Sequence, residues 1–434
     1  MFGLSEDFMR LEAAGTPIAV AIIGVGQMGR ALVNQMVRMP GITPVVIVDH
    51  KAQRVERALA TAAVLEEGYR LVSTVAEAEA AIAAGCIAVS ENDDIAAARQ
   101  VQVVIDATGS TEGAAQLAVN AFSHKKHFIM MTVETDVVIG PLLKRMAAEQ
   151  GVGFTGMAGD EPGAIMELYD FARTMGLEVL VLGKGKNNAV DYDATPDTAA
   201  REAAQKSMNP RMLASFQDCT KTMVELTAVA NATGFMPDCM GAHGVAATTE
   251  TLADRYRLRD EGGVLEHYHV VDYVKGVAPG VFAVVTTDSP ELRRELKYLS
   301  MGDGPNYLLY RPYHLCSLEV PVTVGRLVLY NRPSIVPLDG APYAEVVAFA
   351  KVDLQVGQRL DGIGGYTVYG VIAAYQQAKS LQALPVGLVN GNTIMKRAVQ
   401  KGEIITYADV ELEESSLLVR LRREQDRRIE EKTL

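Results

Sequence analysis

The sequence feature that most constrains the fold is a glycine pattern near the N-terminus. An apolar run from Ile18 to Ile23 leads into Gly24-Val25-Gly26-Gln27-Met28-Gly29, and a helical pattern follows from Arg30 to Met39. A second apolar run, Pro44 to Val48, ends at Asp49. This order predicts a strand–helix–strand unit whose first turn contains the glycines.

The three glycines have different expected roles. Gly24 permits the tight turn, Gly26 lets a pyrophosphate approach the backbone, and Gly29 lets the helix pack closely on the strand. Asp49 lies twenty residues after Gly29, where a ribose-binding carboxylate is expected. We therefore predict a nicotinamide dinucleotide site, with Gln27 and Met28 in its loop. The alternative is a Rossmann fold that has lost its cofactor.

The residues after Asp49 bear on the choice of cofactor. Asp49 alone favours NAD, because a carboxylate repels a 2′-phosphate, but His50, Lys51 and Arg54 supply positive charge nearby. We therefore expect NADPH, although these basic residues also suit an ordinary solvated helix start. Thr108-Gly109, which follows a later apolar run, is expected near the nicotinamide ribose.

Strand and helix patterns alternate through the first third of the chain. Helical patterns at 52–66 and 111–122 flank an apolar run at 101–107, and another follows at 128–132. This alternation predicts an α/β fold with a doubly wound parallel sheet. We expect three domains: a Rossmann domain (1–156), an α+β substrate-binding and oligomerisation domain (157–335), and a small β-rich domain with a charged tail (336–434).

Composition excludes several classes of protein. The net charge of −12 repels polyanions, so no nucleic-acid partner is expected. The absence of a long apolar run or a leader pattern predicts no membrane association and a cytoplasmic location. The four cysteines are widely spaced, which suits free thiols in a reducing compartment.

Two loops after apolar runs carry candidate chemistry. Asp160 and Glu161 lie in a glycine-rich loop before a helical pattern, where they could bind a divalent cation or cap the helix. In Gly183-Lys184-Gly185-Lys186-Asn187-Asn188, alternation places both lysines and Asn188 on one face, while the glycines let a ligand approach the backbone. We expect an anion there; the alternative is a solvated turn with exposed lysines.

Two further sets of residues could act on a substrate. Asp218, Lys221 and Glu225 share one face of a predicted helix, which suits either proton transfer or a surface row of ion pairs. His314 follows a Gly302-Asp303-Gly304-Pro305 turn that could close over a ligand, or it could simply pack. The charge run from Arg420 to Glu431 predicts a solvated helix or frayed tail.

Together the glycine loop, the Gly159–Gly163 loop, the Gly183–Asn187 segment and the Asp218–Glu225 helix resemble homoserine-dehydrogenase-like oxidoreductases. Residues 336–434 resemble a SAF domain, a small β-clip module. The combination is similar to the 1-deoxy-D-xylulose 5-phosphate reductoisomerase-like enzymes, and the likeness covers essentially the whole chain.

The resemblance implies NADPH-dependent conversion of 1-deoxy-D-xylulose 5-phosphate to 2-C-methyl-D-erythritol 4-phosphate in isoprenoid biosynthesis, by a homodimer or larger oligomer. It implies a phosphorylated sugar substrate, with Mg²⁺ or Mn²⁺ as a possible partner ion. Lys184 and Lys186 would hold the phosphate, Asp160, Glu161 and Glu225 would bind metal or hydroxyls, and Lys221 would assist proton movement. The alternatives are a dehydrogenase of another small hydroxy compound and a non-catalytic NADP-sensing scaffold.

Overall fold

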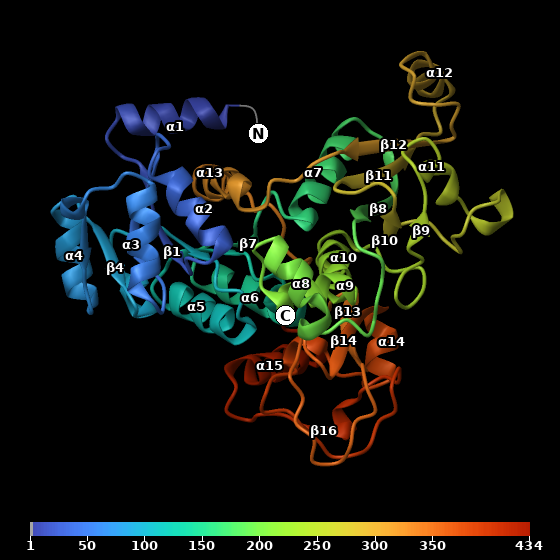
Figure 1. The fold of residues 1–434 in the computed structure, drawn as a ribbon. Coiled ribbons are helices and arrows are strands. Elements are labelled where there is room, and N and C mark those ends of the chain that lie inside the picture. The colour runs from blue at the N-terminus through green and yellow to red at the C-terminus, as the bar shows by residue number, and fades with distance from the viewer. Residues whose placement is uncertain (1–2) are drawn as a thin grey trace. The chain divides into compact units, whose positions relative to one another are not determined.

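The computed structural model describes residues 3–434, which divide into two compact units (Figure 1). The first unit runs to Gly163 and also includes Leu315–Val336. The second contains Ala164–His314 and Pro337–Thr433. The expected β-rich segment at 336–434 therefore belongs to the same compact unit as Ala164–His314, whereas the separate boundary at residue 335 stays a prediction.

A parallel sheet of seven strands forms the centre of the first unit, in the order β3-β4-β2-β1-β5-β6-β7. The order reverses at β1, which has β2 on one side and β5 on the other. This confirms the predicted doubly wound sheet. The strands are β1 (Ile18–Ile23), β2 (Ile42–Val48), β3 (Tyr69–Leu71), β4 (Ile87–Ser90), β5 (Val103–Asp106), β6 (His127–Met130) and β7 (Phe154–Gly156).

The helices of this unit bury apolar side chains against the sheet. Leu32, Val33 and Met36 of one helix join Val20 and Ile22 of β1 in a single core cluster. Burial of such side chains supplies the main favourable free energy of this unit. The helices are α1 (Leu4–Ala13), α2 (Gln27–Met36), α3 (Ala52–Thr61), α4 (Val75–Ala83), α5 (Thr111–Ser123), α6 (Val133–Glu149) and α13 (Val320–Tyr330).

A mixed sheet of five strands forms the centre of the second unit, in the order β12-β11-β8-β10-β9. Strands β8 and β10 are parallel, and β11 runs antiparallel to both β8 and β12. Consequently β8, β10 and β12 share one direction and end at the same edge of the sheet. The strands are β8 (Glu178–Lys186), β9 (Val245–Ala246), β10 (Val270–Lys275), β11 (Val281–Thr286) and β12 (Asn306–Arg311).

Helices accompany this sheet, and the buried helix α10 is central among them. It contacts β10 and β8 as well as β13 and β14 of the C-terminal segment. Nearly all of its residues are buried, so its apolar and polar faces are both covered by protein. The helices are α7 (Glu161–Thr174), α8 (Pro196–Gln205), α9 (Pro210–Gln217), α10 (Thr220–Thr233), α11 (Leu252–Arg255) and α12 (Pro290–Tyr298).

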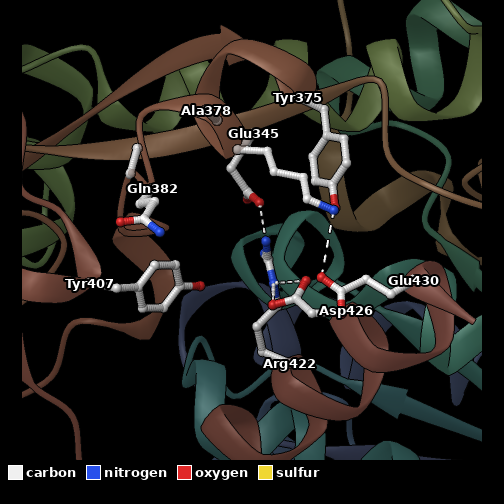
Figure 2. A pocket seen from close by; sticks show the side chains of 10 residues that line it. Glu345, Tyr375, Ala378, Gln382, Tyr407, Arg422, Asp426 and Glu430 are labelled. Carbon is white, nitrogen blue, oxygen red and sulfur yellow. Dashed lines mark hydrogen bonds and ion pairs between the residues drawn. The ribbon is translucent and has the colours of Figure 1, made fainter.

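The C-terminal segment, orange to red in Figure 1, contains two small antiparallel pairs of strands and two helices. Its elements are β13 (Ala344–Ala350), β14 (Val368–Ala374), α14 (Tyr375–Ser380), β15 (Ile394–Met395), β16 (Val410–Glu411) and α15 (Leu417–Glu430). The expected solvated charge run lies in α15, but Arg422 and Gln425 are buried. The predicted helix is present and most of its charge run is exposed or partly exposed, but Arg422 departs from the prediction because it pairs with the buried Glu345 carboxylate (Figure 2).

No helix within residues 3–434 has both the length and the apolar character needed to cross a membrane.

A buried ion pair connects the C-terminal segment to the helices of the same unit. Lys351 lies 2.8 Å from the carboxylate of Asp218, and both side chains are essentially inaccessible. The same ammonium donates to the carbonyls of Ala194 and Gly365. Three acceptors therefore compensate for the desolvation of one cation.

Replacement of this lysine should destabilise the second unit. Lys351→Met leaves the Asp218 carboxylate buried without its cation, which should lower the free energy of unfolding by about 3–5 kcal/mol. The denaturant midpoint measures this effect. The matched control is Lys401→Met, because Lys401 forms an exposed pair with Asp193 that should contribute at most about 1 kcal/mol. Equal midpoints for the two variants would contradict the assigned role of Lys351.

Candidate functional site

The first candidate site lies at the carboxyl edge of the parallel sheet. Gly24 follows β1, Asp49 follows β2, and Ala107 follows β5. The Gly24 amide donates to the Val48 carbonyl, and the Ala107 amide donates to the Ile23 carbonyl. The glycine loop therefore lies at the point where the strand order reverses, which is where α/β sheets bind ligands.

Geometry explains each glycine of the loop. Gly24 has φ +98°, and a Cβ atom there would lie 2.6 Å from the Ala107 carbonyl oxygen. A Cβ atom at Gly29 would lie 1.8 Å from the Gly24 oxygen, so close packing of α2 requires glycine. Gly26 has open space around it, and it is exposed together with Gln27 and Met28. The exposed backbone at the N-terminus of α2 therefore fits a pyrophosphate.

The Asp49 carboxylate holds this loop in place. It is buried, and it accepts hydrogen bonds from the Val25 amide at 2.8 Å and the Lys51 amide at 3.0 Å. Sequence reasoning placed Asp49 correctly at the end of β2 but did not anticipate this second role. The carboxylate thus fixes the two turns that a dinucleotide would contact.

Basic side chains surround Asp49 as expected. The His50 ring lies 3.4 Å and the Arg54 guanidinium 3.6 Å from the same carboxylate oxygen. His50, Lys51 and Arg54 are all exposed. The Arg54 guanidinium therefore partly offsets the Asp49 charge, and the preference for a 2′-phosphate stays a prediction.

A third turn at this edge contains Thr108 and Gly109. The fully buried Asp106, at the end of β5, accepts from both the amide and the hydroxyl of Thr108. Burial raises the pKa of Asp106, although hydrogen bonds from Thr132 and Thr108 oppose the rise. Asp106 was missed, because a single carboxylate at the end of an apolar run gives little signal. Contact of Thr108 and Gly109 with a ribose stays a prediction.

The loop proposed for a cation also lies in the first unit. Asp160 is buried, and Glu161 is partly exposed at the first residue of α7. Their position at a helix start fits the alternative role of capping the helix. The Gly159 carbonyl accepts from the Cys316 amide, so the loop is packed against the returning segment of its own unit.

The second candidate site lies in the second unit, where Lys184 and Lys186 end β8. Both side chains are buried, with exposures of 6% and 7%. The alternative of a solvated turn is therefore wrong, because the alternation of β8 continues to Lys186 and directs both lysines inward. Asn187 and Asn188 follow outside the strand, and Asn187 is exposed.

The glycines that precede each of these lysines, Gly183 and Gly185, have a different role from the one expected. A Cβ atom at Gly183 would lie 2.2 Å from the Asp272 carbonyl oxygen and 2.4 Å from the Phe282 ring. A Cβ atom at Gly185 would lie 2.3 Å from the Val277 oxygen. The expectation that they admit a ligand to the backbone is wrong, because β10, β11 and the turn between them already occupy that space.

The two lysines have different partners. Lys184 forms a short ion pair with Glu225 of α10, and both side chains are buried. The Lys186 ammonium donates to the Phe216 carbonyl oxygen at 2.6 Å. Burial lowers the pKa of Lys186, and the nearby Lys184 cation lowers it further, whereas Cys219, Glu225 and Asp218 act in the opposite direction. A buried ammonium bonded to a neutral carbonyl is suited to an anionic ligand.

The predicted row on α10 is buried, so a surface row of ion pairs is excluded. Lys221 and Glu225 lie in α10, with exposures of 9% and 1%. Asp218 precedes the helix; it accepts from the Thr220 amide and from Lys351. The proton-transfer role predicted for Asp218 therefore does not fit its engagement as a structural anion. For Lys221 and Glu225, a role in proton transfer stays a prediction.

His314 lies three residues beyond the end of β12 and is partly exposed. Nearby, Arg311 forms an ion pair with Glu167 at 2.9 Å and stacks over the Tyr313 ring. In the sheet, Val281 pairs with Lys184 on one side and Arg311 on the other. The backbones of Lys184 and Arg311 are therefore about 10 Å apart at one sheet edge.

Three residues beside the lysines were not predicted. Tyr273 is the register partner of Lys184, and burial raises its pKa, as do Cys219 and Tyr192. Cys219 has φ +72° at the start of α10; burial raises the pKa of its thiol, and the Lys186 ammonium opposes the rise. Burial also raises the pKa of Tyr192. The thiol and both phenols therefore remain protonated, and they can donate hydrogen bonds to a ligand.

Comparison with known families supports an oxidoreductase. Residues 159–320 match the family described as "Oxidoreductase DRL, catalytic domain". Residues 20–141 match the TrkA-N domain. No curated protein matches the chain. The two family matches, with the Rossmann sheet, support an NAD(P)-dependent oxidoreductase whose second unit contains most of the matched catalytic domain.

Solved structures share only distant similarity. A probable dehydrogenase from Thermotoga maritima is 13% identical with a TM-score of 0.41, and scyllo-inositol dehydrogenase from Lactobacillus casei is 12% identical with a TM-score of 0.40. A myo-inositol dehydrogenase from Corynebacterium glutamicum is 10% identical with a TM-score of 0.42. Each comparison covers 73% of this chain and 90% of the other. The inositols after which two of these enzymes are named are said of those proteins alone.

The glycine loop offers a matched pair of substitutions. Gly29→Ala places a methyl against the Gly24 oxygen and should lower the free energy of unfolding by about 1–3 kcal/mol. Gly26→Ala meets open space and should leave the melting temperature unchanged while weakening NADPH binding. Thermal unfolding and fluorescence titration measure the two effects. Unchanged NADPH affinity in Gly26→Ala would contradict this cofactor site.

Burial in the first unit predicts a pH dependence. Asp136 in the first turn of α6 is buried, and burial raises the pKa of its carboxyl to about 7. The folded state retains this proton between pH about 4 and 7, whereas the unfolded state loses it, so stability falls as the pH rises through that range.

Asp136→Asn should therefore be more stable than the wild type at pH 8, by at most about 4 kcal/mol, with a smaller difference at pH 5. Denaturant titrations at both pH values measure this. A difference between the two proteins that does not change with pH would show that Asp136 is already ionised in the folded chain.

Proposed function

We propose that this chain is an NADPH-dependent reductoisomerase that converts 1-deoxy-D-xylulose 5-phosphate to 2-C-methyl-D-erythritol 4-phosphate. The observation that carries the proposal is the buried Lys186 ammonium, which donates to a neutral carbonyl beside a second buried lysine. Glu225 already pairs with Lys184, so the charge offered to a ligand is that of Lys186, and a cation in a low-dielectric site favours an anionic ligand more strongly than an exposed lysine does. A substrate phosphate supplies that charge, and Arg311 lies at the same sheet edge.

The proposed reaction has two parts. The carbon skeleton of the substrate rearranges to an isomeric aldehyde, and the aldehyde carbon is then reduced to an alcohol. Bound NADPH would supply the hydride, and a proton completes the hydroxyl. In this scheme Lys186 holds the phosphate, and Lys221 moves a proton at the rearranging hydroxyl. Glu225 fixes the position of Lys184 through their buried ion pair.

A divalent cation would assist by polarising substrate oxygens. We propose Asp160 and Glu161 as its ligands, because Mg²⁺ and Mn²⁺ prefer carboxylate oxygens. Asp160 is buried, and a bound cation would compensate for the cost of keeping its carboxylate ionised.

The Lys184–Glu225 pair favours a second candidate, a dehydrogenase of another small hydroxy compound. A buried ammonium–carboxylate pair can orient a substrate hydroxyl and accept its proton without any phosphate. The two candidates differ in whether activity requires a phosphorylated substrate, so a single pair of substrates distinguishes them.

Steady-state NADPH oxidation with 1-deoxy-D-xylulose 5-phosphate and Mg²⁺ tests the proposal. Lys186→Ala should lower kcat/KM by about 10- to 100-fold, because one charge-assisted hydrogen bond to the phosphate is lost. The control is Lys206→Ala, a half-exposed lysine of the same unit that pairs with Glu202. The Lys186→Ala variant should bind NADPH with the affinity of the wild type.

Two outcomes would overturn the assignment. Equal loss of activity in both variants would remove the special role of Lys186. Turnover of phosphate-free hydroxy compounds, without turnover of the phosphorylated sugar, would favour the dehydrogenase instead.

A further inference from the structure

An exposed cysteine, Cys239, lies in the second unit, in the segment that joins α10 to β9. The other three cysteines differ from it, because Cys86 and Cys219 are buried and Cys316 is only partly exposed. Neither candidate site uses Cys239. Its surroundings nevertheless contain a histidine and a buried carboxylate in direct contact with each other.

A tight turn brings His243 back to Cys239. The Ala242 amide donates to the Cys239 carbonyl at 3.1 Å, and Gly241 within the turn has φ +85°. The His243 amide donates to the Asp272 carboxylate at 2.9 Å, which fixes the backbone after the turn. As a result, the Nδ1 atom of His243 lies 3.9 Å from the Cys239 sulfur, within hydrogen-bonding reach of that larger atom.

The Asp238 carboxylate orients the His243 ring from the other side. It lies 2.6 Å from His243 Nε2, and its side chain is only 1% exposed. Burial alone would raise the pKa of Asp238, but hydrogen bonds from His243 and from the amides of Glu266 and His267 lower it overall. Asp238 is therefore ionised and can only accept, so His243 Nε2 carries a hydrogen. In the neutral ring, Nδ1 beside the thiol is left as the acceptor.

The Cys239 thiol needs such a base in order to react. Partial burial raises its pKa, and the carboxylates of Asp272 and Asp238 raise it further, whereas Arg259 opposes the rise. The sulfur is therefore protonated at neutral pH, although the thiolate is the reactive form. A histidine that accepts the proton while the sulfur attacks removes this barrier, and a carboxylate that orients the histidine completes the arrangement.

We propose that Cys239 is a modification site at which a small peroxide oxidises the thiol to a sulfenic acid, with His243 as the base and Asp238 as its positioning residue. An exposed cysteine is open to a small oxidant from solvent, so the reaction requires no binding pocket. A peroxide also needs a proton on the oxygen that departs, and His243 can return the proton that it has taken from the thiol.

The proposed step is a two-electron oxidation of sulfur. The Cys239 sulfur attacks one oxygen of the peroxide, so that an S–O bond forms while the O–O bond breaks. The thiol proton passes to His243 Nδ1 and from there to the departing oxygen. Hydrogen peroxide is thereby reduced to water, an organic peroxide is reduced to an alcohol, and Cys239 becomes a sulfenic acid.

Oxidation of the full-length chain by hydrogen peroxide tests the proposal, with dimedone to trap the sulfenic acid and peptide mass spectrometry to measure its rate of formation at each cysteine. We expect Cys239 to react faster than Cys316. His243→Gln should slow the reaction of Cys239 at least about tenfold, because the base is lost. His267→Gln is the matched control, since this exposed histidine lies 3.6 Å from the other oxygen of Asp238, and it should leave the rate unchanged.

A second measurement on the wild type guards against a folding defect in His243→Gln. In guanidinium chloride the turn is lost, so Cys239 and Cys316 should react at similar rates. The proposal is overturned if native Cys239 is not oxidised, if His243→Gln reacts as fast as the wild type, if both histidine variants slow the reaction equally, or if the advantage of Cys239 over Cys316 persists in the denatured chain.

Discussion

The buried ion pair between Lys184 and Glu225 is the contact on which the second unit's site depends. It joins the end of β8 to the middle of α10. Burying either charged group without the other would carry a large desolvation free energy. Because α10 also packs on β13 and β14, the position of Glu225 is fixed from both sides. Lys186, two residues further along β8, is then presented beside the pair.

Charge compensation of this kind recurs within the unit. The Lys351 ammonium donates hydrogen bonds to the Asp218 carboxylate and to two backbone carbonyls. Lys186 differs, because its nearest acceptor is a neutral carbonyl. The contrast separates two lysines that are paired with carboxylates from one that is bonded to a carbonyl, and we propose that this one binds the substrate phosphate. In the first unit Asp49 has the comparable structural role, since it binds the amides of the glycine loop.

Much of the first unit could be predicted from sequence, because the apolar runs and the glycine spacing report directly on local geometry. Gly24, Gly29 and Asp49 all lie where the pattern placed them. Alternation along β8 also correctly placed Lys184 and Lys186 on one face. Such patterns can be predicted because the direction of each side chain is set by the local geometry of its own strand or helix.

The remainder depends on contacts between distant segments, which spacing does not encode. Nothing in the sequence pairs Lys351 with Asp218, places Tyr273 beside Lys184, or shows that Phe282 fills the space at Gly183. Arg422 lies in a charge run that is typical of solvent-exposed helices, yet it is buried on Glu345. In these cases the burial and the partners of a residue are set by packing between distant segments and not by local composition.

We propose that this chain transfers a hydride to a rearranged sugar phosphate. The most direct test is incubation of the full-length chain with Mg²⁺, 1-deoxy-D-xylulose 5-phosphate and NADPH deuterated at the transferable position, followed by mass spectrometry of the product. The account predicts 2-C-methyl-D-erythritol 4-phosphate carrying one deuterium. Recovery of unchanged substrate from a chain that binds NADPH would contradict it.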